Sequence, residues 1–165
     1  MTTVRPSVDL SKVVSLADFE PLARRAMEPG AFDYVAGGAW DERSLGEGLA
    51  VEHGVAGIVV SNHGARQLDR AVATADVLEE IVAAVAGRAE VWVDGGIRRG
   101  LDVVTAVALG ARGVLVGRPI LWALATGGQA GVERALEILR TETLIALTLL
   151  GARTPQELNR AHVAG

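Results

Sequence analysis

The chain has 165 residues, half of them hydrophobic and 22% charged, which is enough apolar material for one globular domain with a buried core. It contains no cysteine, so disulfides, thiolate nucleophiles and cysteine-ligated metal sites are excluded. A net charge of −4, without a stripe of basic residues interleaved with aromatic ones, argues against nucleic-acid binding. No apolar run reaches the roughly 18 residues of a membrane span and residues 1–10 do not resemble a signal peptide, so we expect a cytoplasmic protein.

The amino-terminal part is predicted to be helical. Ser15 and Asp18 form an acidic capping pattern, which predicts a helix over 15–27. The segment AFDYVAGGA at 31–39 predicts a second, short helix that ends at its glycines. Residues 41–48, DERSLGEG, have no apolar period and are interpreted as a linker.

The middle of the chain alternates short apolar runs with amphipathic stretches. The runs at 56–60, 90–93 and 113–116 are continuously apolar, which predicts strands buried on both faces of a sheet. The stretches at 76–85 and 102–109 have helical spacing. This order indicates parallel βαβ units, whose right-handed crossovers bring the loops after all three strands to one edge of the sheet.

The carboxyl-terminal part is also predicted to be helical. A long apolar face predicts a helix over 132–150, and Gly151 follows it as a terminating residue. Thr154 and Glu157 then form a capping box with Pro155 at the first helical position, which predicts a last short helix.

The loop after the second strand, in VDGGIRRG, has the features of an anion site. Asp94 ends the strand, and Gly95 and Gly96 allow the backbone to turn tightly and to approach a ligand. The next helix begins near Arg99 or Gly100, and we expect its free N–H groups to point into the loop. Arg98 supplies a guanidinium for bidentate contact with a phosphate.

The loop after the third strand repeats this design with Gly117, Arg118 and a helix opened by Pro119. Gly and Arg at two consecutive strand ends match the usual phosphate site of (β/α)8 barrels. The alternative is that the glycines only close turns and that the arginines are solvated surface charges. This alternative explains either loop alone about as well as a phosphate site does, but it explains the two loops together less well. No G-x-G-x-x-G dinucleotide fingerprint follows a strand.

The loop after the first strand, SNHGARQLD, carries a histidine and an arginine three residues apart. A lone histidine is more often structural than catalytic. Here, however, Arg66 is placed to hold a substrate carboxylate while His63 removes a proton from the neighbouring carbon or hydroxyl. His53 and His162 lack this context, and no set of residues has metal-ligand spacing, so we expect no metal site.

Three segments together carry a resemblance to a known family. GIVVSNHGARQLD, VWVDGGIRRGLDVVTAVALGARGVLVGRP and FDYVAGGAWDERSL resemble the FMN-dependent α-hydroxy-acid oxidases and dehydrogenases, which include glycolate oxidase, lactate oxidase and mandelate dehydrogenase. The resemblance implies an α/β fold, a TIM barrel with FMN at the carboxyl ends of its strands. It also implies that a 2-hydroxy acid is oxidised to a 2-oxo acid.

The resemblance assigns roles to single residues. His63 would be the catalytic base, and Arg66 and Tyr34 would hold the substrate carboxylate. The residues that would contact FMN lie at all three strand ends. They are Ser61, Asp94, Gly95, Gly96, Ile97, Arg98, Gly117 and Arg118.

The chain departs from the family in its middle, where Leu45-Gly46 runs almost directly into the helix before family strand 6. The resemblance then implies an amino-terminal helical segment, 1–45, followed by a partial barrel, 46–165, that retains only the last three βα units. The family residues lost with strands 1–5 include an aspartate that would partner His63 and a lysine near the flavin. We therefore expect reduced activity and self-association of a sheet with two open edges and an uncovered inner face.

Two other interpretations stay open at this point. The chain could be a non-catalytic half-barrel that keeps the FMN phosphate site but performs no turnover. It could also be a βα-barrel enzyme for another phosphorylated ligand, although His63 and Arg66 would then have no assigned role.

Overall fold

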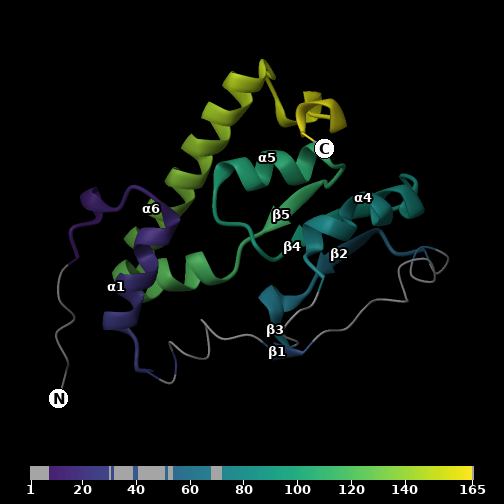
Figure 1. The fold of residues 1–165 in the computed structure, drawn as a ribbon. Helices are drawn as coiled ribbons and strands as arrows, with labels where there is room; N and C mark the ends of the chain where they lie inside the picture. Colours follow the sequence, from purple (N-terminus) through teal and green to yellow (C-terminus); the bar gives the residue numbers. More distant parts are fainter. Residues whose placement is uncertain are drawn as a thin grey trace.

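A computed structural model describes residues 8–29, 31, 39–40, 51, 54–67 and 72–164. Its central sheet has three parallel strands in the order β2 (Gly57–Ser61), β4 (Glu90–Asp94) and β5 (Gly113–Leu115). The helices α4 (Thr74–Val85) and α5 (Gly100–Ala108) follow β2 and β4 and lie beside the sheet (Figure 1). The predicted strand and helix alternation is confirmed, with each boundary within two residues of its expected place.

One face of this sheet is covered and the other is open. Val60, Val91 and Val93 are buried in a core that they share with α4. Val59 and Leu115 point to the opposite face and are 51% and 44% exposed. The prediction of burial on both faces is therefore wrong for β2 and β5. The open face agrees instead with the expectation that a barrel segment of three strands leaves its inner side uncovered.

The amino-terminal helix α1 (Phe19–Ala26) follows a 3-10 turn at Leu16–Asp18. The Asp18 carboxylate accepts hydrogen bonds from the backbone N–H groups of Ser15 and Val14, at 2.8 and 3.0 Å, so the predicted acidic cap is confirmed. These two bonds lower the pKa of Asp18. Phe19 is fully buried in the core that α1 forms with the last long helix.

That last helix, α6 (Arg118–Leu150), contains two helical parts joined at Gly128, whose φ of 58° and ψ of −138° interrupt the helical backbone. The first part begins at the loop after β5, and the second part contains the predicted helix over 132–150. Gly151 ends the helix with a left-handed φ of 73°, as predicted.

The last predicted short helix is present as a 3-10 helix at Pro155–Glu157, with Pro155 at its first position, but its predicted cap is wrong. Thr154 makes no side-chain capping bond. The Glu157 carboxylate instead accepts the backbone N–H of Arg153 at 2.9 Å and pairs with the Arg153 guanidinium at 3.1 Å. A competing local ion pair thus takes the carboxylate that the capping box requires.

A second, short sheet lies next to the loop after β2. Its strands are β1 (Ala39–Trp40) and β3 (Arg66–Gln67), which pair in parallel with Ala39 opposite Arg66. The predicted linker over 41–48 and most of the predicted helix over 31–39, including Tyr34, lie outside the described residues. In the part of the chain that the structure describes, no helix is both long enough and apolar enough to cross a bilayer.

The crossing of α5 and α6 generates a stability prediction. The amino end of α5 approaches α6 so closely that a Cβ on Gly100 would overlap the backbone at Glu142 and Thr143. We expect Gly100→Ala to lower the free energy of unfolding by about 3 kcal/mol, because neither backbone segment can move freely. Urea denaturation measures the loss.

Gly57→Ala is the matched control, because its added Cβ would meet no atom closer than 3.5 Å. We expect this control to unfold within about 0.5 kcal/mol of the wild type. Equal stability of the two variants would contradict the close crossing of α5 and α6.

Candidate FMN-phosphate and hydroxy-acid site

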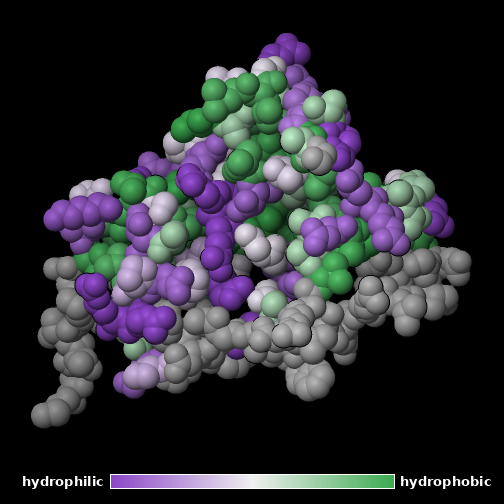
Figure 2. All heavy atoms as spheres, viewed as in Figure 1, coloured by the Kyte–Doolittle hydropathy of each residue, from purple (hydrophilic) through white to green (hydrophobic). Residues whose placement is uncertain are grey.

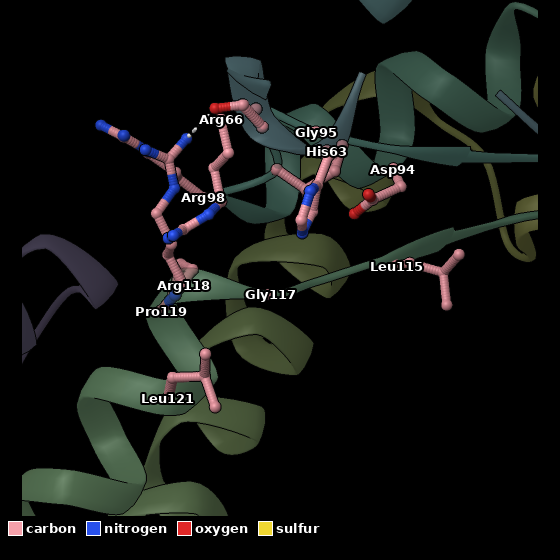
Figure 3. Close-up of a pocket in the computed structure, with 13 residues that line it drawn as sticks. His63, Arg66, Asp94, Gly95, Arg98, Leu115, Gly117, Arg118, Pro119 and Leu121 are labelled. Atoms are coloured by element: carbon pink, nitrogen blue, oxygen red, sulfur yellow. Dashed lines mark hydrogen bonds between the residues drawn. The ribbon is translucent and has the colours of Figure 1, made fainter. Parts of the chain in front are cut away.

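The loops after β2, β4 and β5 meet at one edge of the sheet and form a pocket of about 160 Å³. Its position follows from the parallel register, in which Ser61 lies opposite Asp94 and Asp94 lies opposite Leu115. All the predicted site residues that the structure describes, except Ser61, line this pocket: His63, Arg66, Asp94, Gly95, Gly96, Ile97, Arg98, Gly117 and Arg118. Figure 3 shows most of them around the cavity.

The loop after β4 depends on its two glycines. Gly95 and Gly96 have φ values of 104° and 79°, which side chains other than hydrogen rarely allow. A Cβ on Gly95 would also lie 2.9 Å from the Asn62 Oδ1 atom in the loop after β2. The glycines therefore let the two loops pack directly against each other.

A hydrogen-bond chain connects His63 to the neighbouring strand. The Ser61 hydroxyl donates to Asp94 Oδ2 at 2.6 Å, and the backbone N–H of His63 donates to Ser61 Oγ at 3.0 Å. His63 itself is exposed and lines the pocket together with Asp94. Ser61 thus links the ends of β2 and β4 and orients the backbone that carries the histidine.

Three arginines give the pocket a strong positive charge. Arg66, Arg98 and Arg118 all line it and reach the same side of the cavity in Figure 3. Burial lowers the pKa of Arg118, and the positive charges of Arg98 and Arg66 lower it further. Asp94 and Glu20 oppose this effect without cancelling it. Because like charges at close range repel, the arrangement favours the binding of an anion.

One part of the predicted anion site is wrong. The backbone N–H groups of Arg98 and Arg99 both donate to Asp102 Oδ2 at 2.8 Å, and that of Gly100 donates to Glu142 Oε2 at 2.8 Å. The N–H groups just before α5 and that of its first residue are therefore bonded to carboxylates and do not point freely into the loop. Anion binding on this side of the pocket depends on the arginine side chains.

Asn62 has a role that the sequence did not reveal. Its Oδ1 atom accepts the backbone N–H of Ala65 at 3.2 Å, and its Nδ2 group donates to the carbonyl of Val72 at 3.2 Å. Asn62 therefore closes the turn that contains His63 and ties it to the segment before α4. Asparagine is typical of such turns, which is the signal that could have identified it.

The residues of the pocket fit a phosphate-bearing group better than a complete flavin nucleotide. Arg98 and Arg118 supply guanidinium donors suited to phosphate, and the space beside Gly117 is open. The volume of about 160 Å³ is below the roughly 300 Å³ at which pockets for whole small molecules begin. Among the described residues, no group of His, Asp and Glu side chains could hold a metal ion.

Comparisons with known proteins agree with this geometry. A sequence model of the FMN-dependent dehydrogenases matches residues 47–165. Glycolate oxidase of Spinacia oleracea is 53% identical over 116 residues, which are 70% of this chain and 31% of that enzyme. L-lactate oxidase of a Nostoc species is 56% identical over 110 residues, which are 67% of this chain and 30% of the enzyme.

A solved structure of mandelate oxidase with benzoyl-formic acid is 55% identical and superposes with a TM-score of 0.65, covering 68% of this chain and 35% of that one. The chain thus spans about a third of the length of the curated relatives that it matches. The matched range contains every described site residue, whereas Tyr34 and the rest of FDYVAGGAWDERSL precede it. The pocket chemistry and the matches lead to one conclusion: the chain belongs to the FMN-dependent dehydrogenase family.

Proposed function

We propose that the chain carries the FMN-phosphate end of an oxidoreductase that converts a 2-hydroxy acid to a 2-oxo acid. The observation that carries the proposal is the meeting of His63 and Arg66 with Arg98 and Arg118 around one pocket. A site that binds only phosphate would need only Arg98 and Arg118. The additional base and cation at the same edge are what oxidation of a carboxylate-bearing substrate requires.

The binding roles divide between the loops. Arg98 and Arg118 would hold the phosphate group of FMN, since guanidinium forks match phosphate oxygens. Asp94 would accept a hydrogen bond from the ribityl chain, and Ser61 would lie against the flavin. Bound FMN would supply the two-electron acceptor that the side chains of this protein lack.

The chemical roles belong to the loop after β2. Arg66 would pair with the substrate carboxylate and orient the α-carbon, and Tyr34 would donate a hydrogen bond to the same carboxylate. His63 would accept the proton that the substrate loses as its hydroxyl-bearing carbon is oxidised. The exposed position of His63 at the mouth of the pocket leaves room for the substrate in front of its ring.

The shortness of the chain limits this chemistry. Its matched relatives are about three times as long, and the sheet of the described residues has three strands, in agreement with a partial barrel that lacks family strands 1–5. Without the missing aspartate, an imidazolium at His63 has no dedicated anion to stabilise it. Slow turnover follows from that loss, and the non-catalytic FMN-binding half-barrel is the alternative.

Self-association would cover the surfaces that the partial barrel exposes. The described residues provide no partner for the outer edges of β2 and β5, and Val59 and Leu115 are exposed on the open face. Apolar side chains also gather on the second half of α6, where Leu144 and Leu149 are exposed (Figure 2). A homo-oligomer would remove these apolar surfaces from water.

Flavin reduction tests the proposed activity. We expect the purified protein to bind FMN and to bleach its yellow absorbance when lactate, mandelate or glycolate is added without oxygen. His63→Gln removes the base and should slow bleaching by about 100-fold or more. His162→Gln is the control, because His162 lies in an exposed turn and contacts Asn159. FMN that stays bound but oxidised in the wild type would favour the non-catalytic alternative, and a protein that never binds FMN would refute the cofactor assignment.

Arg98→Gln tests the anion pocket through two opposite effects. Removing one of the crowded charges should raise the melting temperature of the ligand-free protein by about 1–2 °C at low salt. The same change should weaken the binding of inorganic phosphate about tenfold, because a charge-assisted contact is lost. Calorimetry measures both quantities.

Arg112→Gln is the control for this experiment, because Arg112 pairs with Glu90 at 3.1 Å and does not line the pocket. It should leave phosphate affinity unchanged and should not raise the melting temperature. Phosphate binding that is insensitive to Arg98→Gln would place the anion elsewhere on the protein.

Light scattering after size exclusion tests self-association. We expect a mass of at least two chains of 17.2 kDa. Val59→Glu should shift the protein toward monomer by placing a charge on the open face of the sheet. Val14→Glu, at a position that is 71% exposed near α1, should not. A stable wild-type monomer would contradict the proposal.

A further inference from the structure

The turn that carries His63 has an unusual backbone. His63, Gly64 and Ala65 are consecutive and have φ values of 53°, 66° and 59°, all in the left-handed region. For residues other than glycine this conformation costs about 1–2 kcal/mol each. Such a turn persists only where the surrounding structure holds it.

Most of the bonds that hold the turn come from its own neighbourhood. Ser61 Oγ accepts the N–H of His63 at 3.0 Å, and the Asn62 side chain accepts the N–H of Ala65 at 3.2 Å. One bond comes from the first residue of α6, more than fifty residues away. Arg118 Nη2 donates to the carbonyl of Gly64 at 3.0 Å. Figure 3 shows this bond as a dashed line at the side of the pocket.

We propose that Arg118 is a positioning residue that couples anion binding in the pocket to the conformation of the His63 turn. The inference rests on the proposed function, because it assumes that the pocket receives a phosphate group. Its new element is the second role of Arg118, which reaches the histidine through the Gly64 carbonyl.

The chemistry of the guanidinium allows both roles at once. It carries five N–H donors in a rigid plane, and the bond to Gly64 uses one edge of that plane. Donors on the remaining edges can contact a phosphate oxygen at the same time. A lysine has the same charge but lacks the rigid fork, so it cannot bridge two acceptors in a fixed geometry.

The sign of the coupling follows from charge and entropy. Without an anion, Arg98 and Arg66 repel Arg118 and work against holding it in one place. A bound dianion attracts all three cations and immobilises the Arg118 side chain. The bond to Gly64, which is already present without a ligand, is then kept without a further loss of rotamer freedom. Phosphate should therefore tighten the His63 turn, and by linkage the ordered turn should raise phosphate affinity.

Hydrogen exchange measured by mass spectrometry tests this coupling, with inorganic phosphate as the probe because it requires no flavin. In the wild type, saturating phosphate should slow amide exchange over residues 62–67 about tenfold. In Arg118→Lys, phosphate should bind more weakly and should leave the exchange of this segment unchanged even at saturation. Arg98→Lys is the matched control, in which affinity falls but the slowing returns once the site is filled.

The outcomes separate the inference from the function on which it rests. Exchange over residues 132–150 of α6, which do not line the pocket, serves as the internal reference, and a thermal melt shows that each variant is folded. Phosphate that binds the wild type without slowing the turn refutes the coupling and leaves the phosphate site intact. Slowing in Arg118→Lys equal to that in the wild type refutes the role of Arg118. A wild type that binds no phosphate refutes the proposed function and the inference with it.

Discussion

The parallel register of β2, β4 and β5 is the constraint on which the site depends. Because Ser61, Asp94 and Leu115 lie at the same level, the loops that follow them begin within reach of one another. The 2.6 Å bond between Ser61 and Asp94 joins two of these strand ends directly. A shift of β4 by one residue would turn Asp94 to the covered face and would break that bond, and with it the link between β4 and the segment that carries His63. The packing of Val60, Val91 and Val93 against α4 opposes such a shift, so the core fixes the position of the site.

The site is positively charged although the whole molecule has a negative net charge. The chain carries a net charge of −4, yet its pocket gathers three arginines with Asp94 as the lining carboxylate. Two carboxylates beside the loop after β4 bind backbone N–H groups. Asp102 accepts the two N–H groups just before α5, and Glu142 accepts the N–H of Gly100 and pairs with Arg99 at 3.0 Å. Burial and the positive charges of Arg98 and Arg66 lower the pKa of Arg118, and this gathering of positive charge favours the binding of an anion.

The sequence predicts most of the architecture because its signals are local or follow from general topology. Apolar runs and helical spacing identify the strands and helices, and the parallel crossover rule predicts that three loops converge. The errors arise where distant residues decide the outcome. No local pattern indicates that Glu142 caps α5, since the two lie more than forty residues apart in the chain. A count of apolar residues likewise cannot predict the open face of the sheet, because Val59 is as apolar as its buried neighbour Val60 although it is 51% exposed. The local sequence also does not predict the left-handed turn at His63, because part of its support comes from the distant Arg118.

The residues that would bind phosphate and the residues that would perform the oxidation lie in different surroundings. The groups that would hold a phosphate, Arg98 and Arg118, stand on consecutive βα loops, and both loops are held by contacts among described residues. The groups that would perform the oxidation lie on the loop after β2, where His63 is exposed, and Val59 is exposed on the open face of the sheet. An electrostatic site loses strength when water has access to it, because the effective dielectric rises. Catalysis is affected by this exposure more than phosphate binding is, because the developing charges of a reaction must be stabilised by fixed groups on every side of the substrate. Under the proposed function, affinity for the phosphate end would therefore depend less on what covers the open face of the sheet than turnover would.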